Sequence, residues 1–282
     1  MRILSIHAHP DDESSKGAGT IARYVAAGVR AVLVTATGGE AGDILNPAMD
    51  RPEVEERLTE IRGEELAKAA AIIGYADVHM LGYRDSGMPG TEDNGHARAF
   101  ANADAEEALG ALVGIVRSEQ PEVVLGYDDH ERYPHPDHLR VHDLSLELFD
   151  AAADVDRFPD AGEPWQIQKL YAPVFTMTRL LLLHRAMEDQ GLESPFTRWV
   201  DEIDERRPDD RRLTQIDVGG FVETAREALR AHRTQVDPDG FWFQVPTEMV
   251  RDVYPYEDFE LLRSRVGWQE GEDDLFAGVT VR

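Results

Sequence analysis

The sequence predicts an α/β protein in which a mostly parallel sheet is covered by helices and followed by a smaller C-terminal portion. Short apolar runs alternate with longer segments whose apolar residues recur at helical spacing. That alternation is typical of strand–helix–strand units. The apolar runs are rich in Val, Ile and Leu, as are strands that are buried on both faces. We therefore expect helices on both faces of the sheet.

The first part of this alternation consists of three strands and two helices. The run 2–7 predicts a buried strand, and a helix is expected over 17–27. The Val-rich run 29–35 predicts the second strand, after which a glycine-rich loop follows. Apolar residues at helical spacing predict one long helix over 52–73, and a third strand is expected at 78–81. A glycine follows each of these helices and is expected to end it.

The middle of the chain continues the same pattern. Residues 103–118 have helical periodicity, and the apolar run 123–127 predicts a strand. A further helix over 138–153 and a strand over 170–176 complete the predicted sheet. Because each strand is followed by a helix, the connections are of the crossover type that parallel strands require.

The periodicity weakens after residue 180. Helices are expected at 180–187 and 221–232, a charged loop at 206–212, and a solvated, mobile acidic tail at 270–274. We divide the chain into a metal-binding catalytic core, residues 1–180, and a C-terminal portion, residues 181–282. The second part is expected to complete the substrate site within one integrated domain, because 282 residues suit a single large α/β domain.

Composition excludes several kinds of partner and ligand. The net charge of −26 argues against nucleic acid and anionic membranes, which would be repelled. The chain has no cysteine, so disulfides and thiolate ligands are excluded and any metal must be bound by His and carboxylate. We find neither a signal peptide nor an apolar stretch long enough to span a membrane, and we expect a cytoplasmic protein. The oligomeric state stays open.

Two segments with metal-ligand chemistry each follow a predicted strand. His9-Pro10-Asp11-Asp12 comes after the first strand, and His135-Pro136-Asp137-His138 comes after the strand that ends near Tyr127. Ligands of parallel sheets bind beyond the carboxyl ends of the strands, so these distant segments can meet at one crevice. Two His and one Asp can hold Zn²⁺ and leave one position open for water, which is the arrangement of a catalytic zinc.

The remaining polar groups of these segments suit acid–base chemistry. Of the adjacent Asp11 and Asp12, one can bind metal while the other contacts the water as a general base. His135 can lie near the metal without binding it, where it can stabilise an oxyanion or protonate a leaving amine, and Asp137 can orient it. Tyr133 can donate a hydrogen bond to the same oxyanion.

Other candidate residues have a structural interpretation beside the functional one. His7 lies within the first strand and is expected to be structural, and His142 is expected to be a packed or solvated helix residue. Arg62 is either a solvated helix arginine or a contact to substrate hydroxyls. Asp85 is either a sugar-hydroxyl acceptor or a turn-forming residue. Lys16, at the start of the first helix, can reach the mouth of the site.

At these residues the chain resembles the LmbE-like (PIG-L) family of zinc-dependent N-deacetylases and amidases. The resemblance rests on Ala8-His9-Pro10-Asp11-Asp12-Glu13 together with His135-Pro136-Asp137-His138. It implies a Rossmann-like fold. It also implies roles for six residues: zinc binding by His9, Asp12 and His138, base catalysis by Asp11, and assistance to the transition state by His135 and Tyr133.

Further segments resemble the mycothiol S-conjugate amidase branch of that family; they are 14–18, 37–40, 43–50, 158–165 and 231–238. This branch cleaves the amide bond between an N-acetylcysteine S-conjugate and glucosaminyl-inositol, which implies an amino-sugar/inositol thiol conjugate as substrate and a role in detoxification. Lys16 would suit the bulky conjugate, and Arg62 and Asp85 match positions that hold inositol and sugar hydroxyls. The segment 84–91 instead resembles the sister branch, which deacetylates the N-acetylglucosaminyl-inositol precursor of mycothiol.

Three alternatives follow from the residues. The pair His7 and His9 has the spacing of a metal pair in amidohydrolase barrels and metallo-β-lactamase-type hydrolases, although the second segment fits those enzymes poorly. A zinc- or carbohydrate-binding module without catalysis is the non-enzymatic alternative, and Asp11 argues against it because a binder needs no base. Fe²⁺ also suits two His and one Asp, so it is the alternative to Zn²⁺.

Overall fold

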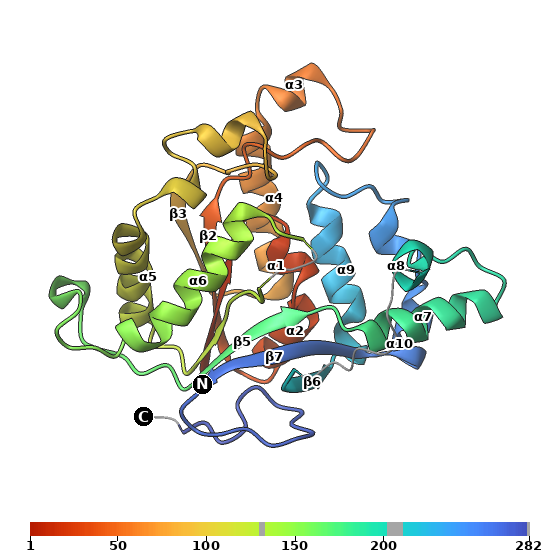
Figure 1. Ribbon diagram of the computed structural model, residues 1–282. Helices are drawn as coiled ribbons and strands as arrows, with labels where there is room; N and C mark the ends of the chain where they lie inside the picture. Colours follow the sequence, from red (N-terminus) through yellow and green to blue (C-terminus); the bar gives the residue numbers. More distant parts are fainter. Residues whose placement is uncertain (130–132, 202–210, 281–282) are drawn as a thin grey trace.

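The computed structural model describes residues 1–129, 133–201 and 211–280. Its centre is a seven-stranded sheet with the strand order β3-β2-β1-β4-β5-β7-β6 (Figure 1). The strands are β1 (Arg2–His7), β2 (Arg30–Thr37), β3 (Asp77–Tyr83), β4 (Val123–Leu125), β5 (Lys169–Val174), β6 (Leu213–Asp217) and β7 (Tyr256–Ser264). The predicted α/β class with a mostly parallel sheet is confirmed.

The sheet changes its winding direction next to β1. Strands β1 to β5 run parallel, whereas β7 is antiparallel to both β5 and β6. The chain first adds β2 and β3 on one side of β1 and then returns to add β4 on the other side, with Ile3 beside Val123 in the register. The carboxyl ends of β1 and β4 therefore flank the point at which open α/β sheets bind ligands.

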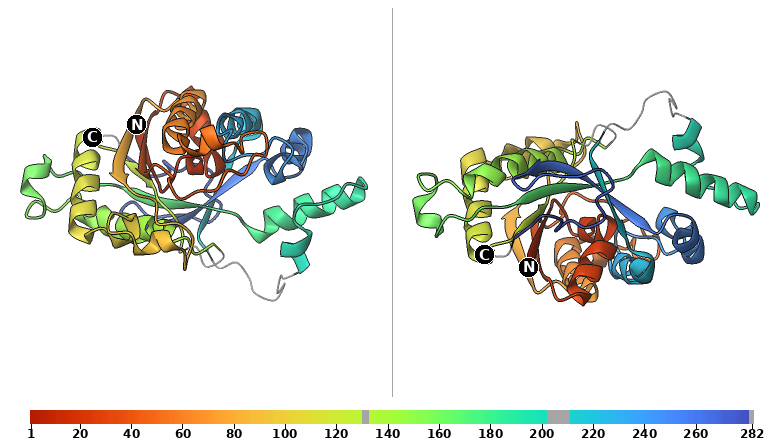
Figure 2. Two further views of the ribbon diagram at one scale, coloured as in Figure 1. Left: turned by 90° about the horizontal axis from the view of Figure 1, so that it is seen from above. Right: turned by 90° about the horizontal axis from the view of Figure 1, so that it is seen from below.

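Helices cover both faces of the sheet (Figure 2). They are α1 (Asp12–Ser15), α2 (Ala18–Ala26), α3 (Pro52–Glu55), α4 (Leu58–Ile73), α5 (Ala105–Glu119), α6 (Pro136–Ala151), α7 (Met177–Asp189), α8 (Thr197–Asp201), α9 (Val222–Ala231) and α10 (Thr247–Val253). Short 3₁₀ turns are η1 (Glu92–Gly95), η2 (Phe100–Asn102), η3 (Pro159–Ala161), η4 (Gly219–Phe221) and η5 (Phe241–Phe243). Helices α5 and α6 pack on one face, and α2, α4 and α9 pack on the other.

The strand β1 shows how the core is built. Its side chains alternate between the two faces. Leu4 and Ile6 join the cluster that contains apolar residues of α5 and α6, whereas Ile3 joins the cluster of α2, α4 and α9. All three are at most 1% exposed. Burial on both faces explains why this run is apolar throughout and ends where polar side chains begin, at the carboxyl edge.

The structure differs from the predicted elements in one helix and in two strands. The long helix predicted at 52–73 is divided into α3 and α4, because α3 buries none of its side chains and packing does not hold it in line with α4. The strands β6 and β7 are additions to the predicted sheet; both are antiparallel, and polar residues alternate with buried ones along them. The charged loop predicted at 206–212 lies almost entirely outside the described residues.

The acidic tail predicted at 270–274 is solvated in part: Glu270, Asp273 and Asp274 are exposed, whereas Glu272 is half-buried. Lys169 donates a hydrogen bond to Glu272 at 2.7 Å, and the Tyr24 hydroxyl donates to Asp274 at 2.7 Å. Leu275 directly after them is completely buried. The carboxylates of this segment therefore serve as acceptors for buried donors of the core. None of the described helices is long and apolar enough to cross a membrane.

Candidate metal centre and active site

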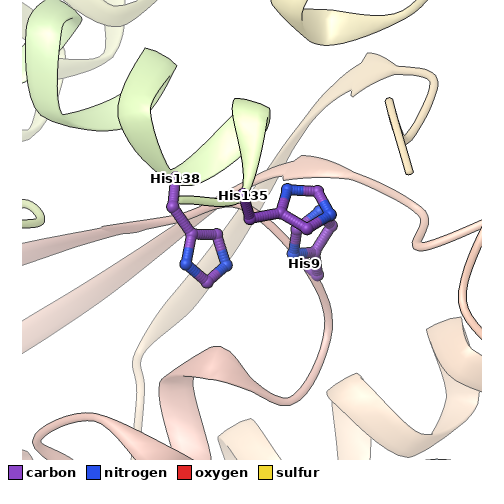
Figure 3. Close-up of side chains that lie close together, drawn as sticks. All are labelled: His9, His135 and His138. Atoms are coloured by element: carbon purple, nitrogen blue, oxygen red, sulfur yellow. The ribbon is translucent and has the colours of Figure 1, made fainter. Parts of the chain in front are cut away.

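The two motif segments meet at the carboxyl ends of β1 and β4. His9 lies in the turn after β1 and Asp12 is the first residue of α1. His135 is the N-cap of α6, and His138 lies in the first turn of that helix (Figure 3). Pro136 occupies the first position of α6, where a missing N–H costs nothing and the fixed φ suits a helix. Figure 3 shows that the side chains of His9, His135 and His138 lie close together, and the distances below show how closely they approach.

One oxygen of Asp12 is shared by both predicted histidine ligands. Asp12 Oδ2 lies 3.4 Å from His9 Nδ1 and 3.4 Å from His138 Nε2. Ligand atoms about 2.0–2.1 Å from a tetrahedral ion are roughly 3.4 Å apart, so each of these two distances, taken by itself, fits a metal such as Zn²⁺. His9, His135 and His138 also offer nitrogens within 4.8 Å of one another. The residues present therefore fit a metal ion, with His135 as an additional nitrogen at the centre.

The other nitrogen of His9 faces two buried carboxylates. His9 Nε2 lies 3.2 Å from Asp137 Oδ2 and 3.4 Å from Asp85 Oδ1. Although burial alone would lower it, the contacts with Asp12, Asp137 and Asp85 hold the pKa of His9 well above its usual value. Carboxylates on the outer nitrogen fix the orientation of a metal-binding imidazole and strengthen it as a ligand. Asp85 also accepts from the Gly87 N–H at 2.8 Å, so it forms a turn and contacts the site at once.

The carboxylate of Asp137 lies among several groups of the site. It contacts His9, accepts from both the backbone N–H and the hydroxyl of Ser86, and lies within 4.8 Å of a His135 nitrogen. The Asp137 backbone N–H donates to His135 Nδ1 at 3.2 Å. His135 is the N-cap of α6, so its side chain accepts from a free N–H group of the first turn.

His135 and Tyr133 lie beside the candidate centre. The His135 ring is 4.6 Å from the His9 ring, and the Tyr133 ring is 5.4 Å from the His138 ring. Burial, together with the neighbouring His9, lowers the pKa of His135. Burial raises the pKa of Tyr133, which still has 49% of its surface exposed. Both groups can therefore donate a hydrogen bond to a ligand at the centre.

Lys16 contacts the remaining oxygen of Asp12. Its Nζ lies 2.5 Å from Asp12 Oδ1, and its side chain is 14% exposed. Burial alone would raise the pKa of Asp12, but the charges of Lys16 and His138 hold it well below its usual range. This shift favours the ionised carboxylate, which is the form that binds a metal ion. Lys16 therefore lies against the predicted ligand Asp12.

Arg62 is a buried residue whose hydrogen bonds link two loops of the site. It is only 2% exposed, and it donates to Gly39 O at 2.7 Å, to Pro10 O at 2.7 Å and to Asp11 Oδ2 at 3.1 Å. A Cβ on Gly39 would lie 2.2 Å from Arg62 Cζ, so the guanidinium fills the space left by that glycine. The interpretation of Arg62 as a solvated helix residue is wrong.

Asp11 differs from its neighbour Asp12 in conformation and in charge state. Its backbone has φ 116° and ψ −26°, a combination that L-residues rarely adopt and that surrounding contacts must maintain. Desolvation raises the pKa of Asp11 to about 6, although Arg62 acts in the opposite direction. Its side chain keeps 28% of its surface exposed. A partly accessible carboxyl with this pKa can both accept and release a proton near neutral pH.

Comparison with known proteins shows the family. The PIG-L family model, described as GlcNAc-PI de-N-acetylase, matches residues 4–149. A mycothiol S-conjugate amidase from Streptomyces coelicolor is 42% identical over 99% of this chain and 97% of its own length. This chain belongs to the PIG-L family. The resemblance predicted from the two motif segments is therefore confirmed, and the chain is an enzyme that hydrolyses C–N bonds, an amidase or a deacetylase.

Other relatives in the PIG-L family are named deacetylases. A 1D-myo-inositol 2-acetamido-2-deoxy-alpha-D-glucopyranoside deacetylase from Geodermatophilus obscurus is 39% identical over 99% of this chain and 98% of its own length. Similarity at this level supports the family and the class of reaction. The difference between 42% and 39% identity does not separate the two activities.

Solved structures share the fold at lower identity. N,N'-diacetylchitobiose deacetylase from Pyrococcus horikoshii has a TM-score of 0.62 and 20% identity, and covers 99% of this chain and 86% of its own. GalB, the 4-carboxy-2-hydroxymuconate hydratase from Pseudomonas putida, has a TM-score of 0.64 and 19% identity, covering 95% of this chain and 98% of its own. Since a deacetylase and a hydratase share this fold, the reaction has to be argued from side chains.

Several PIG-L site contacts were not predicted from the sequence. Ser86 holds Asp137 from the loop after β3, and Glu13 pairs with His232, to which the sequence assigned no role. Glu13 and His232 both lie in segments on which the family resemblance rests, but neither contact could be predicted from spacing, because each joins parts far apart in the chain. His7 and His142 both bond to Tyr127, through its hydroxyl at 3.2 Å and its carbonyl at 2.7 Å.

Proposed function

We propose that this PIG-L enzyme hydrolyses the amide bond of mycothiol S-conjugates, releasing a mercapturic acid and glucosaminyl-inositol. The observation that carries the hydrolytic reaction is the approach of His9 and His138 to one oxygen of Asp12, with Asp11 and His135 beside them. The choice of an S-conjugate is supported by the 42% identity to a mycothiol S-conjugate amidase over nearly the whole chain.

We assign the metal to His9, Asp12 and His138. Zn²⁺ is the first candidate and Fe²⁺ the second, because two imidazoles and one carboxylate suit both ions. When bound, such an ion polarises a carbonyl oxygen and makes water more acidic. Asp137 and Asp85 hold His9 in the orientation for this role through its outer nitrogen.

The remaining residues move protons and stabilise charge. Asp11 accepts a proton from the water that attacks the amide carbon, and its pKa of about 6 is suited to that transfer. The carbonyl oxygen becomes negative as the C–O bond forms, and His135 and Tyr133 donate hydrogen bonds to it. The C–N bond then breaks while protonated Asp11, or His135, delivers a proton to the leaving amine nitrogen.

The substrate contacts are proposed at the mouth of the site. Lys16 contacts Asp12 from the segment between α1 and α2, and we assign it to the conjugate. Asp85 lies at the centre beside His9, and we assign it to sugar hydroxyls. The guanidinium of Arg62 already bonds to the backbone and to Asp11. We therefore propose that Arg62 supports the substrate site by holding Asp11 and its loop.

The decisive experiment compares two substrates of the purified enzyme. Release of free amine is followed with a mycothiol S-conjugate and with N-acetylglucosaminyl-inositol, and kcat/KM is determined for each. We expect the larger value for the S-conjugate. A larger value for the acetylated sugar would favour the second candidate, the biosynthetic deacetylase, which the segment 84–91 and the 39%-identical relative support. No amine release from either substrate would favour a binding module.

Metal removal tests the proposed centre. We expect chelation to abolish amine release and about one equivalent of Zn²⁺ per chain to restore it, because the proposed ligands form one site. Reconstitution with Fe²⁺ under exclusion of oxygen compares the two candidate ions. Full activity of a preparation in which metal analysis finds no bound ion would rule the centre out.

We also propose a cytoplasmic location. A chain without cysteine has no disulfide that would require an oxidising compartment, and a net charge of −26 opposes adsorption to anionic lipid. Recovery of the enzyme in the membrane fraction of its host after cell breakage would contradict this assignment.

A further inference from the structure

A buried pair joins the C-terminal portion to the metal-site turn. His232 directly follows α9, and its Nε2 lies 2.6 Å from Glu13 Oε1. Both side chains are completely buried. Glu13 is the residue after the predicted metal ligand Asp12, whereas His232 is 219 positions further along the chain. The two residues therefore bring one of the most distant parts of the chain against the candidate centre.

The second oxygen of Glu13 extends this contact to Asp11. The Asp11 backbone N–H donates to Glu13 Oε2 at 2.9 Å, while the Ser14 hydroxyl donates to Oε1 at 2.5 Å. Glu13 thus uses one oxygen for His232 and Ser14 and the other for Asp11. Because each of these bonds involves a buried carboxylate, it is stronger and more directional than a bond between neutral groups.

The contact with Glu13 acts on the part of Asp11 that is conformationally unusual. At φ 116° the Asp11 N–H is turned toward Glu13, and its carbonyl accepts from the N–H groups of Ser14 and Ser15 at 3.0 and 3.1 Å. This turn lets adjacent carboxylates point to different groups: Asp12 to its histidines and Asp11 to Arg62. Loss of the Glu13 contact would free the backbone to relax toward a more common conformation and would redirect the Asp11 carboxylate.

The segment that carries His232 is itself held against α4. Thr234 donates to Glu65 through its N–H at 2.9 Å and its hydroxyl at 2.6 Å, and Asn46 donates to Arg233 O at 2.8 Å. Glu65 lies one turn after Arg62 on the same helix. Helix α4 therefore holds the Asp11 carboxylate directly through Arg62, and it also holds the His232 segment that acts on the Asp11 backbone.

We propose that His232 is a positioning residue, which acts through Glu13 to keep the Asp11 carboxylate directed at the candidate centre. The inference rests on the proposed function, in which Asp11 is the base. It gives the C-terminal portion a part in the reaction that needs no contact with the substrate. The observation behind it is the continuous chain of contacts from His232 Nε2 through Glu13 to the Asp11 N–H.

A matched pair of amide substitutions tests the proposal. In His232→Gln the amide nitrogen stands near the position of Nε2 and can still donate to Glu13, whereas in His232→Asn it stands near Nδ1 and cannot. We expect His232→Asn to lower kcat by roughly 10- to 100-fold, as small displacements of a reacting group do. KM and the metal content per chain should stay as in the wild type, and His232→Gln should recover most of kcat. Equal kcat for both variants and the wild type would overturn the proposal.

A second readout does not depend on the reaction. Crystal structures of both variants should show Asp11 at positive φ in His232→Gln and in the wild type, but relaxed in His232→Asn. If the Asp11 backbone in His232→Asn were the same as in the wild type, the positioning role would be refuted. This test holds even if the wild-type enzyme hydrolyses neither the S-conjugate nor the acetylated sugar. Such inactivity by itself contradicts only the proposed function. If His232→Asn does not fold, His232→Leu provides the same comparison, since it also lacks a donor.

Coupling to Asp11 completes the test. In an Asp11→Asn background, His232→Asn should cause no further loss of kcat, because its effect passes through the Asp11 carboxylate. Equal fold-losses in the two backgrounds would show that His232 acts elsewhere. A purely structural role would instead lower the melting temperature of both amide variants and leave the kcat of the folded fraction unchanged.

Discussion

Two adjacent carboxylates of the same type obtain different properties from the turn in which they lie. Asp12 is buried between Lys16 and His138, whose charges hold its pKa low, as suits the metal ligand that we propose. Asp11 faces Arg62 and is desolvated, and its pKa rises to about 6. Divergent pKa values in neighbouring acids are what distinguish a ligand from a proton acceptor.

Replacing Asp11 separates these two roles. We expect Asp11→Asn to lower kcat by about 10²- to 10⁴-fold, the usual effect of removing a general base, while metal per chain stays unchanged. The matched variant Asp12→Asn should lose metal, because it removes the oxygen that both histidines approach. Metal analysis of both proteins beside steady-state kinetics is the measurement. Loss of metal from Asp11→Asn would show that the two assignments are reversed.

The glycine beside Arg62 allows a second test at the scale of one residue. Gly39 has φ 71° and Gly28 has φ 88°, but a Cβ on Gly39 would meet Arg62 at 2.2 Å, whereas one on Gly28 would meet nothing within 4 Å. Gly28→Ala should therefore cost about 1–2 kcal/mol of stability, the penalty for a left-handed backbone, with kcat unchanged. Gly39→Ala should cost more and should also reduce kcat, because Arg62 is displaced from Asp11. Urea unfolding with activity assays checks both, and equal effects of the two variants would contradict the role of Arg62.

Residues of the candidate site could be predicted where they follow the carboxyl ends of neighbouring strands. His9 and His138 are brought together because β1 and β4 are neighbours and both motifs follow their carboxyl ends. The contacts of Asp137 could not be predicted, since they depend on a loop after β3 that delivers Ser86. No sequence feature of Arg62 shows whether it is buried or solvated. It is buried because it donates a hydrogen bond to the backbone of another loop, at Gly39.

At the scale of elements, the parallel strands were predictable and the antiparallel ones were not. Strands β1 and β2 are buried on both faces and read as apolar runs. In β7 the buried Phe259 and Leu261 are separated by charged residues, and even Asp258 is buried. That carboxylate is tolerated because Thr176 and Tyr254 donate to it at 2.8 Å each. A strand that buries a hydrogen-bonded carboxylate lacks the apolar run, or the regular alternation of apolar and polar residues, by which strands are recognised in a sequence.

The network around Asp258 predicts a dependence of stability on alkaline pH. Burial, with the nearby Asp258 carboxylate, raises the pKa of Tyr254 to about 12, against about 10 in an unfolded chain. Between these values the unfolded state binds fewer protons, so stability falls as pH rises. Tyr254→Phe lacks the hydrogen bonds of the hydroxyl, so its free energy of unfolding at pH 8 should be lower than that of the wild type. Above about pH 10 the wild type loses stability, so the two free energies of unfolding should approach each other.

Melting temperatures measured from about pH 8 to pH 11 check this expectation. The neighbouring Tyr256, which is 37% exposed, provides the matched control as Tyr256→Phe. A constant difference between Tyr254→Phe and the wild type over this range would contradict the assignment. Kinetics are not expected to change, because Tyr254 joins α10 to β7 and bonds neither to Asp11 nor to the candidate ligands.

At the scale of the whole molecule, the C-terminal third is part of the same sheet as the metal-site strands. Strands β6 and β7 extend this sheet beyond β5. His232 bonds to Glu13 next to the candidate centre, and Glu272 of the acidic tail bonds to Lys169 at the start of β5. The sequence predicted that this portion would complete the site, but none of these contacts has a motif. They arise from packing between segments that are far apart in the chain, which single-sequence periodicity does not reveal.

The acidic tail should therefore determine stability but not catalysis. Lys169 is completely buried at the start of β5, and Glu272 is the carboxylate that compensates its charge at 2.7 Å. Glu272→Gln should cost about 3–5 kcal/mol, because it leaves a buried ammonium without its counter-charge. Adding Lys169→Met should restore most of that loss, since an apolar side chain of similar length needs no partner. The kcat of the folded enzyme should stay unchanged in both, because Lys169 lies at the edge of the sheet opposite the motif segments. Denaturant unfolding measures the stability, and a stable Glu272→Gln protein would show that the tail is as solvated as its composition suggests.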